Sequence, residues 1–320
     1  MQGLFTAAVV GLGRIGSSYP SSNIPRSHTA AYLSNSRIRM IAGVDPNPLA
    51  RLDFRNKWGN EINIFSSVNE MLTAGIRPDI VSLCTTPNNL EQNIKDFIGY
   101  KPKAYFLEKP AISSEKQCTE LLSAIRDTPV AINYHRCWDP KHKAFFQEIK
   151  TKKIFTIRVL YSKGIFNYAS HILALLIQNF GDINSITKIS NHDESDMIND
   201  RSHSFLCNFE NKIMAIFQGT EKINYDLMEI DFVTDEGIYS LKSGGCRQRV
   251  EKPINSLFYK NYSSLTDAPI CETDGQIEGL SQAIDNIINF LDKKTDKLEC
   301  DLQCAITVFK LIDKINNQKN

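Results

Sequence analysis

The sequence predicts an α/β protein of two domains: a doubly wound parallel sheet, followed by an α+β domain built on a large, mostly antiparallel open sheet. The 320 residues are about twice the ordinary domain length of roughly 150 residues. Up to about residue 130, short apolar runs alternate with helix-period segments, which is typical of βαβ units. Beyond about residue 150, short β-rich runs are separated by turn residues, which favours antiparallel strands. The predicted domains are residues 1–130 and 131–320.

The first domain contains four nearly apolar runs that are predicted as strands of the parallel sheet. They are AAVV (7–10), MIAGV (40–44), IVSLC (80–84) and AYFL (104–107). Such strands are buried on both sides, because helices cover both faces of a parallel sheet. The covering helices are predicted at residues 27–35, 67–75, 90–100 and 114–127.

The second domain is predicted to hold five strands and a helix. The strands are expected at residues 155–161, 203–209, 213–219, 227–234 and 237–242. The helix, residues 170–181, ends at Gly181, where a C-cap glycine belongs. Two closing helices are predicted from two apolar stripes and are free to pack back on the first domain. The stripes are Leu280, Ile284, Ile287, Ile288 and Leu291, and then Leu302, Ile306, Phe309 and Ile312.

Charge and composition exclude several classes of protein. Lys and Arg number 37 against 36 acidic residues, so no excess of positive charge favours binding to nucleic acid. The apolar opening, residues 1–13, lacks a basic leader and is interpreted as a buried strand. No apolar run approaches the roughly 18 residues of a membrane span. We expect a cytoplasmic protein with no nucleic-acid and no membrane partner.

The eight cysteines are scattered, with no C-x-x-C pair and no histidine at zinc-finger spacing. They are interpreted as reduced thiols, in keeping with the cytoplasm. Cys300 and Cys304 lie one helical turn apart, but two ligands do not make a tetrahedral zinc site. We predict core packing for this pair and no metal site.

A glycine motif follows the first predicted strand directly: Gly11, Leu12, Gly13, Arg14, Ile15 and Gly16. In a strand–turn–helix context, G-x-G-x-x-G is the Rossmann dinucleotide-binding fingerprint. The first glycine permits a tight turn, the second lets the pyrophosphate approach the backbone, and the third permits close helix packing. The alternative is a glycine-rich turn in an α/β domain that binds no nucleotide.

Asp45 closes the second predicted strand, where its carboxylate can accept from a ribose hydroxyl. It lies 34 residues after Gly11 rather than the usual distance of roughly 20. Pro20 and Pro25 explain the excess, because this segment cannot continue a helix and must loop out before the helix resumes. The carboxylate favours NAD over NADP, unless Arg14 or Arg51 compensates the 2′-phosphate.

Two polar turns follow the third and fourth predicted strands of this sheet: Thr85, Thr86, Pro87 and Asn88, and then Glu108, Lys109 and Pro110. Ligands of open α/β sheets bind beyond the carboxyl ends of the strands, so both turns are expected to line the cofactor crevice. Lys109 is a donor able to polarise a carbonyl or relay a proton. The alternative is a surface turn with an ordinary solvated lysine.

Four motifs together resemble the Gfo/Idh/MocA oxidoreductases: the glycine fingerprint, T-P-N at 86–88, E-K-P at 108–110, and N-x-x-R-x-x-D-P at 133–140. The resemblance implies an NAD(P)-binding Rossmann domain in residues 1–130 and a substrate-binding, oligomerising domain in residues 131–320. It implies hydride exchange at a secondary alcohol or ketone carbon of a sugar, nucleotide-sugar or cyclitol. Lys109 would lie near the nicotinamide and the reacting oxygen, and the open sheet would pack in a homodimer or homotetramer.

Members of the family often carry D-x-x-x-H at the start of a second-domain helix. The matching segment here has His171 but Asn167 in place of the aspartate. Asparagine can hydrogen-bond but cannot exchange a proton. Three alternatives follow: Lys109 and His171 suffice as the catalytic pair, the asparagine reflects a different substrate, or the protein binds cofactor without efficient turnover. For His171 itself, the alternative is a core histidine on an apolar helix.

Three further polar residues were assigned from the same patterns. His135 and Arg136 follow the strand VAIN and, with Tyr134, are expected to face the same cleft, where they would bind substrate alongside Asn167. For Arg136 a domain-bridging ion pair is an equal alternative. His28 begins the resumed helix, and we expect it to cap that helix rather than approach the cofactor. The competing function is a dinucleotide-binding protein that acts as a sensor or pathway partner.

Overall fold

The structure, a computed structural model, describes residues 3–20, 25–97, 99–190, 200–221, 223–266, 270–272 and 278–318. For residues 87, 88 and 270–272 it describes the backbone alone. Contacts within the chain divide it into two compact units, Met1–Trp138 with Ile277–Ile306 and Asp139–Gln276 with Thr307–Asn320. The cofactor and substrate roles of residues 1–130 and 131–320 stay predictions.

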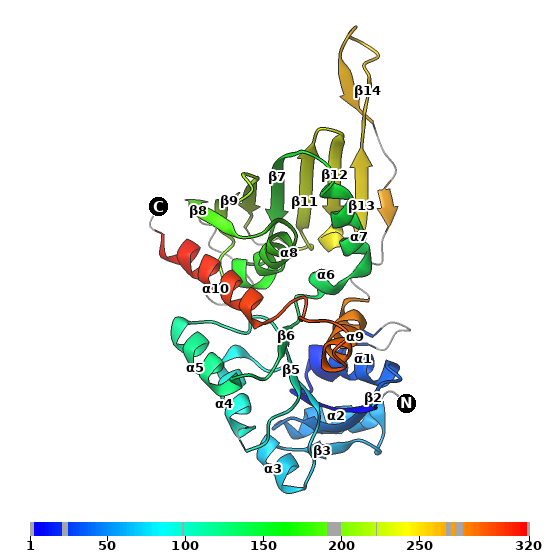
Figure 1. Ribbon diagram of the computed structural model, residues 1–320, viewed down its shortest axis with the longest axis vertical. Coiled ribbons are helices and arrows are strands. Elements are labelled where there is room, and N and C mark those ends of the chain that lie inside the picture. The colour runs from blue at the N-terminus through cyan, green and yellow to red at the C-terminus, as the bar shows by residue number, and fades with distance from the viewer. Residues whose placement is uncertain are drawn as a thin grey trace. The chain divides into compact units, whose positions relative to one another are not determined.

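The first unit is built on a six-stranded parallel sheet in the order β3-β2-β1-β4-β5-β6, which confirms the predicted class (Figure 1). The strands are β1 (Phe5–Val10), β2 (Ile38–Val44), β3 (Asn63–Phe65), β4 (Ile80–Leu83), β5 (Ala104–Leu107) and β6 (Val130–Ile132). The side chains of β4 and β5 are buried on both faces, as their apolar sequences require.

Four helices of this unit begin at a side chain that accepts from a free backbone N–H group. Ser27 accepts from Ala30, and Ser114 accepts from Gln117. The elements are η1 (Arg14–Ser18), α1 (His28–Ser34), α2 (Pro48–Trp58), α3 (Val68–Thr73), α4 (Pro87–Asp96), α5 (Glu115–Ile125), α6 (His135–Trp138) and α9 (Gly279–Leu291). The prediction that His28 caps the resumed helix is wrong: Ser27 caps α1, and His28 is buried.

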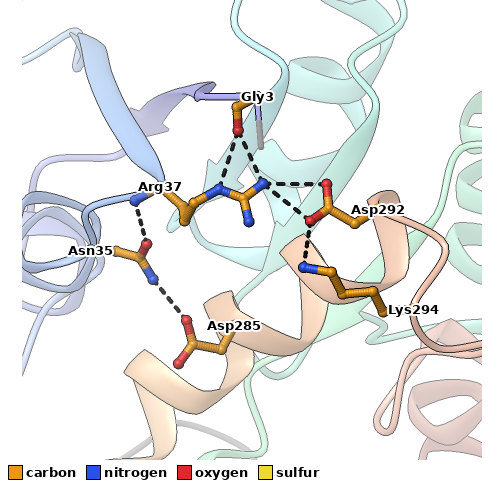
Figure 2. Close-up of polar contacts among 6 residues, drawn as sticks. All are labelled: Gly3, Asn35, Arg37, Asp285, Asp292 and Lys294. Atoms are coloured by element: carbon orange, nitrogen blue, oxygen red, sulfur yellow. Dashed lines mark hydrogen bonds and ion pairs between the residues drawn. The ribbon is translucent and has the colours of Figure 1, made fainter. Parts of the chain in front are cut away.

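The closing helix α9 returns to the first unit and packs on α1. Figure 2 shows the polar contacts at its solvent edge. Asn35 donates to Asp285 over 2.8 Å, and the Arg37 guanidinium bonds both Gly3 O and Asp292. Lys294 adds a second cation to Asp292, so the pKa of that carboxyl is lowered by hydrogen bonds from Lys294 and Arg37.

The second unit is built on an eight-stranded sheet in the order β16-β13-β12-β11-β7-β10-β9-β8, in which every pair except β7 with β10 is antiparallel. The large, mostly antiparallel sheet was predicted and is confirmed. The strands are β7 (Ile154–Tyr161), β8 (Ile183–Ser190), β9 (Ser204–Phe209), β10 (Met214–Gly219), β11 (Met228–Thr234), β12 (Gly237–Lys242), β13 (Arg247–Glu251) and β16 (Ile270–Glu272).

Helices cover one face of this sheet. Along β11, buried residues alternate with half-buried ones, the pattern of a sheet with one covered face. Phe146 and Phe180 from the covering helices pack on Phe232 of β11, with ring centroids 5.5 and 6.0 Å away. The helical elements are α7 (Pro140–Ile149), η2 (Ile165–Ala169), α8 (Ser170–Phe180) and η3 (Ser243–Gly245), and α10 (Leu302–Asn317) belongs to this unit from Thr307 onward. α8 ends at Gly181 with φ 87°, the predicted C-cap.

Some elements were not predicted. α2 begins with Pro48 after the capping Asn47, but only Phe54 of its residues is buried, so its apolar stripe is too narrow to recognise. The hairpin of β14 (Pro253–Asn255) and β15 (Ser263–Leu265) has no buried face to impose alternation. Within the described part of the chain, no helix is long and apolar enough to cross a membrane.

Candidate cofactor and active site

The glycine turn lies between β1 and η1, and each glycine meets a different steric requirement. Gly11 has φ +91°, and a Cβ there would lie 2.6 Å from the carbonyl oxygen of Cys84. A Cβ on Gly16 would lie 1.9 Å from Gly11 O. A Cβ on Gly13, by contrast, would meet no atom within 4 Å, and this residue is exposed. Gly11 and Gly16 therefore shape the turn, while Gly13 keeps its outer surface open.

That open surface fits a pyrophosphate. The first hydrogen bonds inside η1 are donated by Ser17 and Ser18 to Gly13 O. The N–H groups ahead of them form the turn's amino-terminal end, where anions bind. A pyrophosphate that approaches the backbone at Gly13 would occupy space that the side chain of any other residue would fill. The residues present thus fit the dinucleotide that the fingerprint predicts.

As predicted, the helix that follows the glycine turn is interrupted: η1 ends at Ser18, and α1 begins only at His28. α2 holds the end of η1 through two side chains. Lys57 Nζ donates to Ser17 O and Tyr19 O, and Trp58 Nε1 donates to Ser17 Oγ over 2.9 Å. Burial lowers the pKa of Lys57. Of the predicted cofactor residues here, Arg14 is exposed over the Tyr19 ring, and Ile15 is half-buried.

Asp45 follows β2 and lies beside the glycine turn. Its Oδ2 accepts from the backbone N–H of Leu12 over 2.8 Å, and its Oδ1 accepts from Asn47 N over 2.8 Å. Each carboxylate oxygen keeps a lone pair for a ribose hydroxyl. Arg51 donates to the backbone oxygens of Asp45 and Pro46, so its guanidinium is held beside the same strand end.

Backbone hydrogen bonds continue from one strand end to the next along this edge of the sheet. The pairs are Gly11 N to Val44 O, Cys84 N to Val10 O, Glu108 N to Leu83 O and Asn133 N to Leu107 O, all between 2.8 and 3.0 Å. The glycine turn, Asp45, the Thr85–Thr86 turn and the E-K-P turn therefore share one edge. Thr86 is the N-cap position of α4, and Thr85 accepts from Asn93. The side chains of Pro87 and Asn88 lie outside the described residues.

A buried polar network lies directly behind this edge. His28 Nε2 lies 2.9 Å from Glu108 Oε1, and its Nδ1 lies 2.8 Å from Ser82 Oγ. Tyr32 OH also bonds Ser82 Oγ, over 2.7 Å, and burial raises the pKa of that phenol. Asn133 Nδ2 donates to Glu108 Oε1 over 2.5 Å. The network fixes Glu108, and with it the turn that carries Lys109.

Lys109 is half-buried and joined to Pro110 by a cis peptide bond. His135 and Arg136 lie on α6, just after β6, with His135 half-buried and Arg136 6% exposed. Tyr134 is buried beside the thiols of Cys137, Cys300 and Cys304, and burial raises its pKa. The expectation that Tyr134 faces the same cleft as His135 and Arg136 stays a prediction.

The remaining predicted site residues, Asn167 and His171, lie in the second unit at the junction of η2 and α8. Asn167 is half-buried and His171 is 4% exposed. Asp200, itself 4% exposed, holds the start of this junction: Oδ1 accepts from Phe166 N over 2.7 Å, and Oδ2 accepts from Asn167 N over 2.9 Å. A Cβ on Gly164 would collide with this carboxylate at 2.2 Å.

Sequence reasoning missed Ser82, Tyr32 and Asp200 in these networks, and it gave His28 the wrong role. Ser82 is the one polar residue inside an otherwise apolar strand, and that position was a usable signal. His28 gave only the signal of opening a helix. Asp200 gave none, because it follows Asn167 by 33 residues and belongs to no motif. In the described residues, no group of three or more His, Cys, Asp or Glu side chains is arranged to hold a metal ion.

Residues 5–135 match the model of the GFO_IDH_MocA family, described as an oxidoreductase family with an NAD-binding Rossmann fold. Over these residues the chain resembles the NAD-binding domain of that family. The resemblance that the sequence motifs indicated is thereby confirmed. No curated protein matches the chain by sequence.

Solved structures share the fold of both units. An oxidoreductase from Agrobacterium radiobacter, in complex with NAD+, L-tartaric acid and magnesium, matches with TM-score 0.76 and 15% identity over 98% of this chain and 97% of its own. The WlbA dehydrogenase from Bordetella pertussis, in complex with NADH and UDP-GlcNAcA, matches with TM-score 0.75 and 16% identity over 99% of this chain and 95% of its own. The transcriptional regulator Gal80p from Kluyveromyces lactis matches with TM-score 0.77 and 14% identity over 98% of this chain and 89% of its own.

Proposed function

We propose that this Gfo/Idh/MocA-type protein is an NAD-dependent oxidoreductase acting on a secondary alcohol or ketone carbon of a sugar, nucleotide-sugar or cyclitol. The observation that carries the proposal is the open surface at Gly13 on the edge that also holds Asp45 and the E-K-P turn. NAD, when bound, supplies the hydride acceptor or, as NADH, the donor. Gly11, Gly13, Arg14, Ile15 and Gly16 would hold the pyrophosphate, and Asp45 the adenosine ribose.

Lys109 is the residue we assign to the reacting oxygen. It follows β5 at the strand ends where ligands of open α/β sheets bind. The buried contacts of Glu108 with His28 and Asn133 fix the backbone that carries it. An ammonium held there can donate to a carbonyl oxygen, or orient a hydroxyl as it loses its proton.

His171 is the residue we assign to proton exchange, with Asn167 orienting the substrate through its amide. Imidazole titrates near neutral pH, which suits a reversible exchange with a hydroxyl. Asn167 can donate and accept hydrogen bonds but carries no charge. His135 and Arg136 complete the proposed substrate-binding set, and Thr85, Thr86, Pro87, Asn88 and Glu108 the cofactor-binding set.

The substrate class is supported by what related folds bind. L-tartaric acid and UDP-GlcNAcA, the molecules bound by two of the similar structures, both contain secondary alcohol carbons. A putative myo-inositol dehydrogenase from Sinorhizobium meliloti 1021 has the same fold, with TM-score 0.73 and 16% identity over 98% of each chain. We also propose that the protein is cytoplasmic and a homodimer or homotetramer, with no nucleic-acid or membrane partner.

The proposal is tested in two stages. Calorimetry measures NAD and NADH binding, and absorbance at 340 nm then follows turnover over a panel of sugars, cyclitols and nucleotide-sugars. With a substrate found, Lys109→Ala is expected to lower kcat by about 100-fold or more while NAD binding stays near wild type. Lys116→Ala, a change to an exposed lysine on α5, is the control. Full turnover by the Lys109→Ala variant would refute the role of this lysine.

A second candidate function is binding of the dinucleotide without turnover, in a sensor or pathway partner. Asn167 in place of the aspartate favours it, because the amide cannot take a proton. One protein of the same fold is a transcriptional regulator. Tight NAD binding with no change at 340 nm across the panel, in wild type and in Asn167→Asp alike, would favour this function over catalysis.

A further inference from the structure

The most exposed apolar side chains of the described structure lie together on the hairpin of β14 and β15. Leu257 and Phe258 at its tip are 90% and 87% exposed, and Tyr259 and Tyr262 beside them are each 69% exposed. Ile254 and Leu265 add half-exposed apolar side chains on the two strands. A clustered apolar surface of this kind marks an interaction site, whereas single exposed apolar residues need no explanation.

The hairpin follows β13 at the edge of the large sheet but forms no strand pairing with that sheet. β13 pairs with β12 and β16, whereas β14 and β15 pair with each other in a separate two-stranded sheet. Figure 1 shows β14 projecting from the end of β13, beyond the strands of the large sheet. An isolated two-stranded hairpin is marginally stable in water, so contact with a partner surface would stabilise this one.

The tip is nonetheless a folded turn. Ser256 N donates to Tyr262 O over 2.8 Å, and Ser256 Oγ accepts from the N–H groups of Phe258 and Tyr259. The rings of Tyr259 and Tyr262 meet edge to face with centroids 6.0 Å apart. A tip ordered in this way presents Leu257 and Phe258 outward at little entropic cost, as a binding surface requires.

The same unit contains a groove at the opposite end of the sheet order, where β8, β9 and β10 lie. It has a volume of about 600 Å³, and its lining combines apolar side chains with polar ones: Ile189, Ile216 and Ile223, and Ser190, Ser204, Gln218, Thr220 and Glu221. Ile189 is 59% exposed and Ile216 37% exposed. Glu221 at this groove and Lys260 in the hairpin tip are both exposed, so the groove and the tip each carry one exposed charge, and the two charges are of opposite sign.

We propose that the hairpin Pro253–Leu265 is an arm that inserts Leu257 and Phe258 into the Ile189–Ile216 groove of a second copy of this chain. A two-fold axis makes the exchange reciprocal, so two equivalent contacts close the dimer. One leucine and three aromatic rings expose roughly 500 Å² per arm. Two arms bury on the order of 1,000 Å² of their own surface and the receiving surfaces add to this, which lies near the lower end of the range of stable interfaces. The inference rests on the homo-oligomer proposed above and names the segments that form it.

The test compares the mass in solution of the wild-type chain with that of Leu257→Ser/Phe258→Ser, by light scattering over a range of concentrations. The tip variant is expected to dissociate at concentrations at least about 100-fold higher than wild type. Leu49→Ser/Leu52→Ser is the matched control, because these leucines are 67% and 52% exposed on α2 of the other unit. Unchanged NAD binding by both variants would show that the fold is intact.

The receiving groove is tested separately with p-benzoylphenylalanine at position 258. On irradiation of a mixture of isotopically light and heavy chains, crosslinks are expected between copies and onto peptides that contain Ile189 or Ile216. A wild-type chain that is monomeric would overturn both the oligomer and the arm. An oligomer that withstands the tip substitutions, or crosslinks elsewhere, would overturn the arm alone. Tip-dependent binding of a monomer to phosphatidylcholine–phosphatidylserine vesicles would assign the tip to a membrane surface instead.

Discussion

Gly13 and Gly16 are three residues apart, yet the space around them differs. Gly13→Ala adds a methyl group to open space at φ −66°, which alanine adopts readily. Gly16→Ala drives a methyl group onto Gly11 O at 1.9 Å. We expect Gly13→Ala to fold normally and to bind NAD at least about 10-fold more weakly, because the methyl group occupies the pyrophosphate's space. Gly16→Ala is expected to destabilise the fold by roughly 1–3 kcal/mol. Urea denaturation measures the loss of stability in Gly16→Ala, and calorimetry measures the loss of NAD affinity in Gly13→Ala. Wild-type NAD affinity in Gly13→Ala would contradict this account.

Asp200 is the buried carboxylate that fixes the start of α8, and two backbone N–H groups depend on it. Asp200→Ala leaves both without this acceptor, at a cost of roughly 2–3 kcal/mol. Asp226→Ala is the control, since Asp226 is 68% exposed in its pair with Lys163 and surface pairs contribute little. A stability change no larger than the control's would contradict the capping role.

At the scale of elements, Asp79 joins the starts of three strands. Its Oδ2 accepts from the N–H and hydroxyl of Thr6 in β1, and its Oδ1 lies 2.9 Å from Lys103 Nζ, just before β5. Burial opposes ionisation of Asp79, but the hydrogen bonds from Thr6 and Lys103 outweigh it and hold the pKa below its ordinary value.

Asp79→Ala is therefore expected to cost about 2 kcal/mol at pH 7. A carboxyl whose pKa is lowered by folding contributes stability above its unfolded pKa of about 3.9, and loses it as pH falls through the lower folded value. The difference in urea midpoint between wild type and variant should be constant from about pH 7 to pH 5 and shrink below about pH 4. A difference that grew in acid would contradict the assignment.

At the scale of the whole chain, cofactor binding should be visible as stabilisation. A ligand that binds only the folded state at 100 times its Kd adds about 2.7 kcal/mol to the free energy of unfolding. NAD should therefore raise the Tm of the wild-type chain in a concentration-dependent way, and it should raise that of Gly13→Ala less. NADP should have a smaller effect, because the Asp45 carboxylate repels a 2′-phosphate. Equal shifts by both cofactors would overturn the preference for NAD.

The parallel sheet and the cofactor turn were predictable because each depends on residues close together in the sequence. A buried parallel strand needs a continuous apolar run, and the glycine turn needs three glycines at fixed spacing. Asp45 follows from the same logic, since it ends the neighbouring strand. The family resemblance rested on such local motifs, and the part of it that was tested lies in residues 5–135.

Only the tertiary structure decided which distant polar groups meet. His28 contacts Glu108 across 80 residues of sequence, and Asp200 reaches back 33 residues to Asn167. Such pairs depend on how buried helices and strands pack. A buried polar group needs a hydrogen-bond partner, and the packing decides which distant residue supplies it. The exposure of Leu257 and Phe258 is likewise a tertiary property, because most leucines and phenylalanines elsewhere in the described structure are buried in the core. The local sequence thus determined the elements and the cofactor turn, while the burial of side chains decided which residues support them.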